Sequence, residues 1–244
     1  MRQYRNRMMA CLITGGIALS LCHNGMAQSK KEESLLQQTS EVNNLMVQYQ
    51  ADRGSLTRFY AVPFSPERRE RLVKFQQDYL QQLESLPFDQ LSTGSKVDYI
   101  LFKRNIDNQI RLLDAEAKGY EQIKNLLPFA SPIYELEKQR RRGLSLNGKK
   151  LAADMYVWQQ QIRQSMLALQ QEPDMDMPQA EMTSAVVRGL QQALKSVFDF
   201  YFGYDPGFSW WVERPYKTTD SLLNLYTGQL KAKGKITTTQ KDDG

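Results

Sequence analysis

The sequence contains two cysteines and one histidine, and all three lie near its beginning, at Cys11, Cys22 and His23. From residue 24 onward neither residue type occurs. This absence excludes disulfide bonds, thiol nucleophiles, histidine-based catalytic triads and zinc sites built from Cys or His in that part of the chain. The groups left for chemistry are carboxylates, lysines, arginines and hydroxyls.

Sequence motifs for nucleotide binding and for serine hydrolases are absent as well. There is no GxGxxG or GxSxG, no GxxxxGK that is followed by Ser or Thr, no strand-like alternation and no solenoid repeat. The overall composition, 41% hydrophobic and 24% charged, is that of an ordinary globular protein. The 244 residues are enough for one sizeable core and for one or two domains.

The first 27 residues have the features of a secretory signal peptide. Three arginines precede an apolar run from Met8 to Cys22, and small residues, Gly25 and Ala27, occupy the positions expected before a cleavage site. We therefore predict cleavage after Ala27 and a secreted or periplasmic protein. The predicted organisation is a signal peptide at 1–27, a helical domain at 28–232, and a polar tail or the start of a further part at 233–244.

Two ways of staying on a membrane are disfavoured by the same segment. The apolar run is interrupted by Gly15 and Gly16 and is shorter than the ~20 residues that a membrane-spanning helix needs. A lipid anchor would use Cys22, but the residue before it, Leu21, is not small. We expect no membrane association after cleavage.

The positive net charge belongs largely to the predicted signal peptide. Residues 1–27 hold three arginines and no acid, so that their removal lowers the formal charge from +5 to +2. The remaining basic cluster, Lys138 with Arg140, Arg141 and Arg142, is too local for a nucleic-acid footprint. We interpret it as the charged C-terminus of a helix that ends before Gly143, and we predict no nucleic-acid partner.

Apolar residues recur at three- and four-residue spacing through most of the chain, which predicts an all-α fold, an antiparallel array of about six to eight helices joined by short connections. Capping residues and prolines mark several ends, for example Ser65-Pro66 and Ser131-Pro132. The predicted helices cover about 30–52 (ended by Gly54), 66–86, 93–126, 131–142, 151–169, 181–201 and, restarted by Pro215, 215–231.

The predicted helix from Thr93 to Leu126 should be the central one. Its span is ~45 Å at 1.5 Å per residue, and Ser95 with Asp98 resembles a capping box at its start. Additional apolar residues widen its apolar surface beyond a single stripe: Val97, Ile100, Leu101 and Leu112. We therefore expect it to contact most of the other helices.

The segment from Phe200 to Leu222, FYFGYDPGFSWWVERPYKTTDSL, interrupts the helical pattern. Its glycines and prolines predict a structured loop that holds large aromatic side chains. Trp210 and Trp211 either plug the core or contribute, with Tyr204, to a groove for a peptide or sugar. Because successive side chains of an extended backbone face opposite sides, we expect one tryptophan in the core and the other at the groove.

Acidic residues offer two further hypotheses. A carboxylate pair, Asp205 with Glu213 or Asp220, has the residue types of a glycosidase. Asp174 and Asp176 are spaced like calcium ligands, but the segment has no glycine and no downstream bidentate acid. A solvated helix connection is the favoured interpretation of these two aspartates. The glycosidase hypothesis is weak as well, because any two acids of a helical protein would fit it.

Four segments carry a resemblance to a known family: GYDPGFSWWVERPYK at 203–217, LPFDQLSTGSKVDYILFKRNI at 86–106, NLLPFA at 125–130 and EKQRRR at 137–142. They resemble the N-terminal half of a large bacterial family known as domain of unknown function eight-eight-five, whose signature is GYDPxFxWWxxxPYK. The resemblance covers about residues 55–232.

Members of that family resemble secreted or periplasmic zinc metallopeptidases, carboxypeptidase-like enzymes with an H-E-x-x-H helix in a C-terminal half that this sequence lacks. The resemblance implies zinc and a peptide substrate for the longer protein, no catalytic residue, cofactor or metal ligand in this chain, and a cleft wall formed by Tyr204, Asp205, Trp210, Trp211 and Tyr216. The expected function is thus a non-catalytic part of such a peptidase. The alternative is a stand-alone secreted helical domain for binding or scaffolding.

Overall fold

The computed structural model describes residues 40–171 and 173–235, and within them the fold is all-α, as predicted. The predicted signal peptide, the first part of the first predicted helix and residues 236–244 lie outside this description. Seven α-helices are described: α2 Asn43–Phe59, α3 Pro66–Glu84, α4 Thr93–Ile123, α5 Ala130–Arg141, α6 Gly148–Gln171, α7 Met177–Tyr201 and α8 Pro206–Lys233. Two short 3-10 helices, Phe88–Gln90 and Lys124–Leu126, flank α4.

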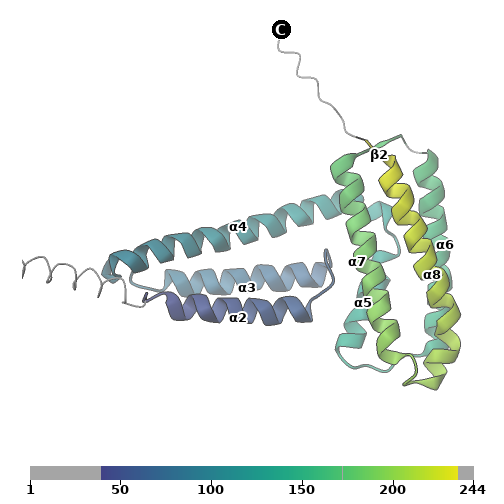
Figure 1. Ribbon diagram of the computed structural model, residues 1–244, viewed down its shortest axis with the longest axis horizontal. Coiled ribbons are helices and arrows are strands. Elements are labelled where there is room, and N and C mark those ends of the chain that lie inside the picture. Colours follow the sequence, from purple (N-terminus) through teal and green to yellow (C-terminus); the bar gives the residue numbers. More distant parts are fainter. Residues whose placement is uncertain (1–39, 172, 236–244) are drawn as a thin grey trace, which may run out of the picture.

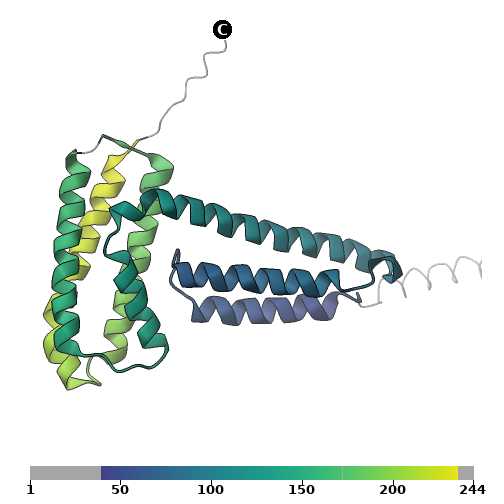
Figure 2. The same cartoon turned by 180° about the vertical axis from the view of Figure 1, so that it is seen from behind.

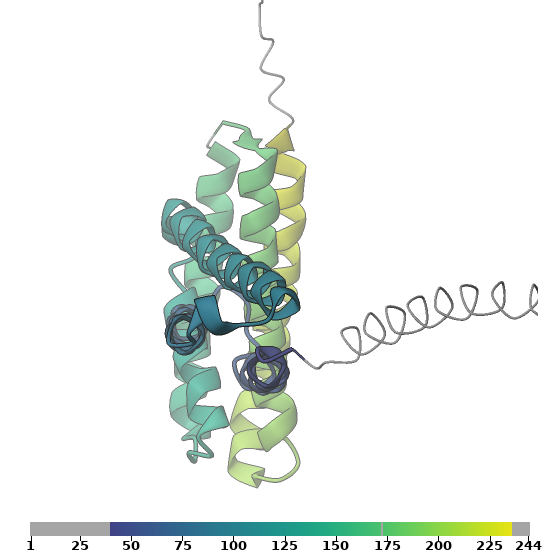
Figure 3. The ribbon, with the colours of Figure 1, turned by 90° about the vertical axis from the view of Figure 1, so that its left-hand side faces the viewer.

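The helices form two groups (Figure 1). Helices α2, α3 and α4 lie side by side in what we call the arm, and α5 to α8 form an upright bundle. Each group has its own hydrophobic core, and α4 contributes to both: Phe102 and Ile106 belong to the arm core, and Tyr120 and Ile123 belong to the bundle core. Figure 2, seen from behind, and Figure 3, seen along the arm, show the arm projecting from one face of the bundle.

An aromatic cluster holds the arm together. Tyr49 of α2 is buried, and its ring lies 5.1–5.2 Å from the rings of Phe75, Tyr79 and Phe102. The buried Tyr49 hydroxyl donates a hydrogen bond to Gln76 at 3.1 Å, so this polar group has a partner. The spacing of these residues on α3 and α4 is the helical spacing from which the sequence predicts those helices.

Helices α6 and α8 run in the same direction and lie close together at their beginnings. A Cβ added to Gly148 would come within 2.9 Å of the Phe208 Cα, and Gln159 donates a hydrogen bond to Thr219 about three turns further along both helices. Only glycine allows this approach of the two backbones. At the other end of the bundle, Met175–Asp176 (β1) and Gly234–Lys235 (β2) pair as a short parallel ladder, which the sequence does not predict.

The prediction that the long helix contacts most of the others is wrong. Helix α4 packs along α3 and meets the bundle with its C-terminal end, mainly at α7, whereas α7 contacts α4, α5, α8 and both strands. The additional apolar residues of α4 do not widen a buried face, because Val97, Ile100, Leu101 and Leu112 are each more than half exposed. A wide apolar surface on a helix therefore did not identify its partners here.

Several predicted helix ends differ from the observed ones. Helix α4 is capped by Ser92, whose hydroxyl accepts a hydrogen bond from the Ser95 N–H, and not by Ser95. Helix α2 continues through Gly54 to Phe59, since a glycine within a helix costs only ~1 kcal/mol. Helix α5 begins at Ala130 without a side-chain cap, after the fully buried Phe129. The Ser65 cap and Pro66 start of α3 are confirmed.

Replacement of Tyr226 by Phe should alter the alkaline stability of the bundle. Tyr226 is fully buried, and its hydroxyl donates to the Leu126 carbonyl at 2.9 Å. Burial raises the pKa of Tyr226 to about 12, compared with ~10 in an unfolded chain. The folded protein thus keeps a proton that the unfolded chain loses, and this stabilisation, present below pH ~10, disappears as the pH rises toward 12.

We expect Tyr226→Phe to cost ~1 kcal/mol at neutral pH, because the hydrogen bond is lost. Between pH 10 and 12 the variant should lose stability less steeply than the wild type, by up to ~1.4 kcal/mol per pH unit. Urea unfolding at a series of pH values measures both effects. Parallel loss of stability in the two proteins over this range would contradict the assignment.

Candidate functional site

The turn between α7 and α8 is shorter than predicted and is fixed by backbone hydrogen bonds. After α7 ends at Tyr201, Gly203 adopts a left-handed conformation with φ of 82°, which glycine reaches at no steric cost. The N–H groups of Tyr204 and Asp205 donate to the Tyr201 carbonyl at 3.2 and 3.0 Å. The predicted loop from Phe200 to Leu222 is therefore wrong, and only residues 202–205 lie outside the helices.

Asp205 begins α8. Its carboxylate accepts hydrogen bonds from the N–H groups of Gly207 at 2.9 Å and Phe208 at 3.0 Å, and Pro206 occupies the first helical position. The Ser209 hydroxyl adds two bonds, accepting from the Gly203 N–H and donating to the Asp205 carbonyl. This satisfies helix donors that would otherwise lack partners. The segment G-Y-D-P-G-F-S is a compact helix start.

Helix α8 continues through Pro215, where the sequence predicts a new beginning. A proline within a helix removes one backbone hydrogen bond and usually bends the helix. Here the carbonyl of Pro215 accepts from the Gln159 amide at 3.1 Å and from the Thr219 hydroxyl at 2.8 Å. Side chains of α6 and α8 thus bind the backbone near the interruption, which helps one continuous helix to persist.

Neither tryptophan of the pair enters the core. Trp210 is 83% exposed and Trp211 is 44% exposed, whereas Phe208 and Val212 on the same helix are fully buried. The prediction of one core and one groove tryptophan is wrong because the backbone is helical, and in a helix the buried positions repeat every three to four residues. The apolar spacing from Phe208 through Val212 to Thr219 and Leu223 was the signal in the sequence.

The five predicted cleft residues fall into two sets. Asp205 caps α8, and Tyr216 is half-buried with its ring stacked 4.0 Å from that of Phe198, where burial raises its pKa. Tyr204, 87% exposed, joins Trp210 and Trp211 as a large side chain left in solvent. We call the exposed aromatic residues at this end of the bundle the aromatic face: Phe200, Phe202, Tyr204, Trp210 and Trp211.

Cations border the aromatic face. The Lys149 ammonium lies 5.6 Å from the ring center of Trp211, and the Arg140 guanidinium lies 5.9 Å from that of Phe200. These distances allow cation–π attraction of ~0.5–1 kcal/mol each at exposed sites. The face therefore offers flat aromatic rings beside two cations, of which Arg140 is also paired with Glu137.

The acidic residues of this segment do not form the proposed carboxylate pair. Asp205 lies eight residues before Glu213 and fifteen before Asp220, which corresponds to ~12 and ~22 Å along a helix. Glycosidase carboxylates are ~5–9.5 Å apart. Each acid also has another partner: Glu213 binds Lys217, and Asp220 accepts from Gln191. Of the second acidic pair, Asp174 binds Lys235, which favours the solvated connection over a calcium site.

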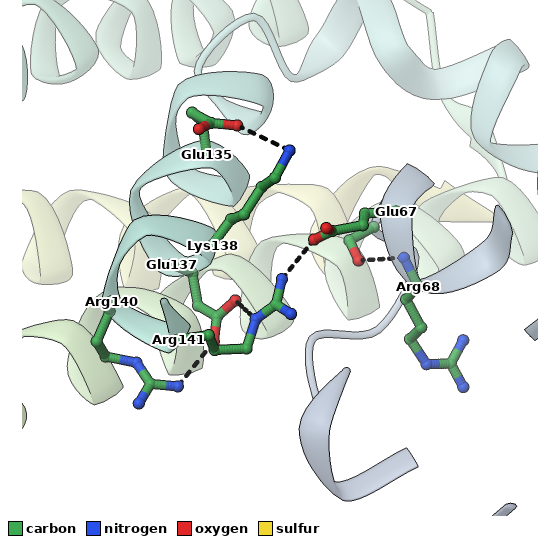
Figure 4. Close-up of polar contacts among 8 residues, drawn as sticks. Glu67, Arg68, Glu135, Glu137, Lys138, Arg140 and Arg141 are labelled. Atoms are coloured by element: carbon green, nitrogen blue, oxygen red, sulfur yellow. Dashed lines mark hydrogen bonds and ion pairs between the residues drawn. The ribbon is translucent and has the colours of Figure 1, made fainter. Parts of the chain in front are cut away.

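A cluster of charged residues joins the arm to the bundle (Figure 4). Arg141 of α5 binds the buried Glu137 at 2.6 Å and also contacts Glu67 of α3, and Arg140 binds the other Glu137 oxygen at 2.8 Å. The Arg141 guanidinium lies 4.8 Å from the ring center of Tyr60. A cavity of about 180 Å³ adjoins these residues. The basic cluster does end α5, but Arg141 is a buried connector, which charge patterning did not reveal.

The larger cavities lie elsewhere and none of the five predicted cleft residues lines them. One of about 750 Å³ lies along the first half of α7, and another of about 660 Å³ lies along α4. Among residues 40–171 and 173–235, no three His, Cys, Asp or Glu side chains are close enough to hold a metal ion. In the same residues no helix has the length and apolar character of a membrane span.

The zinc implied by the family resemblance does not fit the described residues. They include no Cys or His, and the carboxylates nearest the aromatic face are engaged as helix cap or ion-pair partners. Comparison with known proteins gives no further guidance, since no family model, curated protein or solved structure matches this chain.

Proposed function

We propose that this chain is a non-catalytic binding module whose aromatic face contacts a peptide. In the wider setting that the family resemblance suggests, this face would be one wall of the substrate cleft of a secreted or periplasmic metal-dependent peptidase. The chain would supply contact area and orientation for the substrate, and the metal and its ligands would belong to a different part of the protein.

The observation that carries the proposal is that some residues of the segment 203–217 stabilise the fold, whereas two large aromatic side chains of the same segment do not. Gly203, Asp205, Phe208 and Pro215 each have a structural role in a turn, a cap, the core or a helix contact. The side chains of Tyr204 and Trp210, at 87% and 83% exposure, contribute to none of these. Large aromatic side chains left in water gain stability only when a partner covers them, and Tyr and Trp dominate many binding surfaces.

A stand-alone docking module is the second candidate, and one observation favours it. The aromatic face is not hollowed by the cavities described above, so it suits a broad partner surface as well as a narrow peptide. Both candidates use the same residues. They differ in what covers them: an extended peptide or the folded surface of another protein.

Tryptophan fluorescence offers a direct test, since the third tryptophan, Trp158, is buried and gives a stable background. We expect at least one member of a panel of unstructured decapeptides, of acidic, basic, aliphatic and aromatic composition, to protect Trp210 and Trp211 from iodide quenching. Trp210→Ala should weaken that binding about tenfold or more, as hot-spot residues do.

The matched control is Leu225→Ala, because Leu225 is 59% exposed on the same helix but lies away from the aromatic face. It should leave peptide affinity unchanged. If no decapeptide binds, peptide recognition is ruled out and the docking candidate replaces it. If Leu225→Ala weakens binding as much as Trp210→Ala, the aromatic face is not the binding surface.

A further inference from the structure

An open cavity of about 750 Å³, within the size range of small-molecule sites, lies along the first half of α7. It lies at the end of the bundle near β1 and β2, opposite the turn that bears the aromatic face (Figure 1). Its apolar wall is formed by Met177 and Met182 of α7 and by Phe64, which precedes α3. Methionine side chains are unbranched and adapt readily to an apolar ligand.

A buried hydroxyl without a partner lies in this wall. Ser184 is 1% exposed, and its Oγ makes no hydrogen bond. The adjacent Thr183, on the same helix, instead donates its hydroxyl to the Gln179 carbonyl at 2.7 Å. A buried polar group without a partner is destabilising, so a ligand that accepts a hydrogen bond from the Ser184 hydroxyl would be favoured here.

Charge is unevenly distributed at the rim. Arg188, one turn after Ser184 on the same face of α7, and Lys231 of α8 both line the cavity, and neither has a hydrogen-bond or ion-pair partner among the described residues. One acid, Glu181, also lines it. The rim therefore has an excess of one positive charge, which complements a single negative charge on a ligand.

The backbone at the rim is strained. Phe64 has a φ of 62°, in the left-handed region that a bulky residue rarely adopts. Such conformations are energetically unfavourable and are concentrated at ligand sites. The adjacent Pro63 contacts Gly189 of α7, so the segment that carries Phe64 is fixed against the same helix.

We propose that this cavity binds an aliphatic monocarboxylate. The carboxylate would accept hydrogen bonds from the Ser184 hydroxyl and the Arg188 guanidinium, whose planar donors suit a carboxylate. The hydrocarbon chain would lie against Met177, Met182 and Phe64. This site is separate from the aromatic face, and it neither requires nor supports the function proposed above.

Isothermal titration with decanoate tests the site, with decylamine and 1-decanol as probes of equal chain length. Decanoate should bind saturably below millimolar concentration, and decylamine should bind at least tenfold more weakly. Affinity should rise about fourfold for each methylene from octanoate to dodecanoate, as expected for a buried chain. Absence of saturable binding, or equal binding of decylamine, would overturn the proposal.

Two variants assign the contacts. Arg188→Met should weaken decanoate binding about tenfold or more, whereas Arg163→Met, a change at another exposed, unpartnered arginine on α6, should have no effect. Ser184→Ala should weaken binding and, without ligand, raise the melting temperature by about 2–4 °C, because the unpaired hydroxyl is removed. Equal effects of the two arginine variants, or a lowered melting temperature for Ser184→Ala, would rule out the assigned contacts.

Discussion

Replacement of Arg141 by Met should destabilise the protein by ~3–5 kcal/mol, a large part of the ~5–15 kcal/mol that holds a domain of this kind together. The side chain of Arg141 is only 9% exposed, and its partner Glu137 is 5% exposed. Removing the guanidinium leaves a buried carboxylate with only Arg140 beside it and releases Glu67 of α3. The loss should therefore also loosen the arm from the bundle.

A comparison with an exposed ion pair separates burial from charge. Lys150→Met breaks the pair with Asp154 on α6, whose side chains are 74% and 41% exposed, and should cost less than ~0.5 kcal/mol. Urea unfolding, followed by circular dichroism, measures both variants. An Arg141→Met cost as small as that of Lys150→Met would mean that the cluster in Figure 4 does not hold the arm to the bundle.

Phe208→Ala should also destabilise the protein by ~3–5 kcal/mol, because it leaves a cavity in the bundle core. The Phe208 side chain is 1% exposed, its ring lies 5.2 Å from that of Tyr201, and its backbone meets Gly148. The neighbouring Gly148 has no side chain that could fill this space, so closing the cavity would require α6 to move against α8. The melting temperature should fall accordingly.

Trp210→Ala, two residues away, serves as the matched comparison. It removes a larger side chain, but one that is 83% exposed, so that the free energy of unfolding should change by less than ~0.5 kcal/mol. Thermal melts of both variants check the contrast. Comparable destabilisation by the two substitutions would place Trp210 in the core and remove the basis for the aromatic face.

The all-α fold could be predicted because its signals are local. The stripe Leu151, Met155, Trp158 and Ile162 repeats at helical spacing, and all four residues are buried in α6. The start of α3 is likewise indicated by two adjacent residues, the N-cap Ser65 and Pro66 at the first helical position. Element type depends on such short-range patterns, which one sequence displays fully.

What could not be predicted depends on contacts between distant segments. Arg141 was placed correctly at a helix C-terminus, but it is buried against Glu67 and Tyr60, which lie 74 and 81 residues earlier in the chain. Pro215 by itself indicates a helix boundary. The Gln159 contact that accompanies the continuous helix comes from α6, so the residues around Pro215 do not reveal it. The two-residue ladder of β1 and β2 is too short to produce any alternation.

The aromatic residues of the segment led to the candidate site in the sequence, but the backbone conformation predicted for them was wrong. Tyr204, Trp210 and Trp211 do lie near one another in the chain at one exposed end of the bundle, while Asp205 and Tyr216 serve the fold. The error arose from assuming an extended backbone around two glycines and two prolines. Recognising Asp205 as the N-cap of α8 would have predicted a helix from Pro206 onward.

The most direct test of this account is the dissociation constant of the tightest decapeptide for a variant with Tyr204, Trp210 and Trp211 all changed to Ser. Because these side chains contribute little to the fold, the melting temperature should stay within a few degrees of the wild type, while peptide affinity should fall by a factor of about 100 or more. Unchanged affinity in a folded variant would contradict the assignment of this surface to binding.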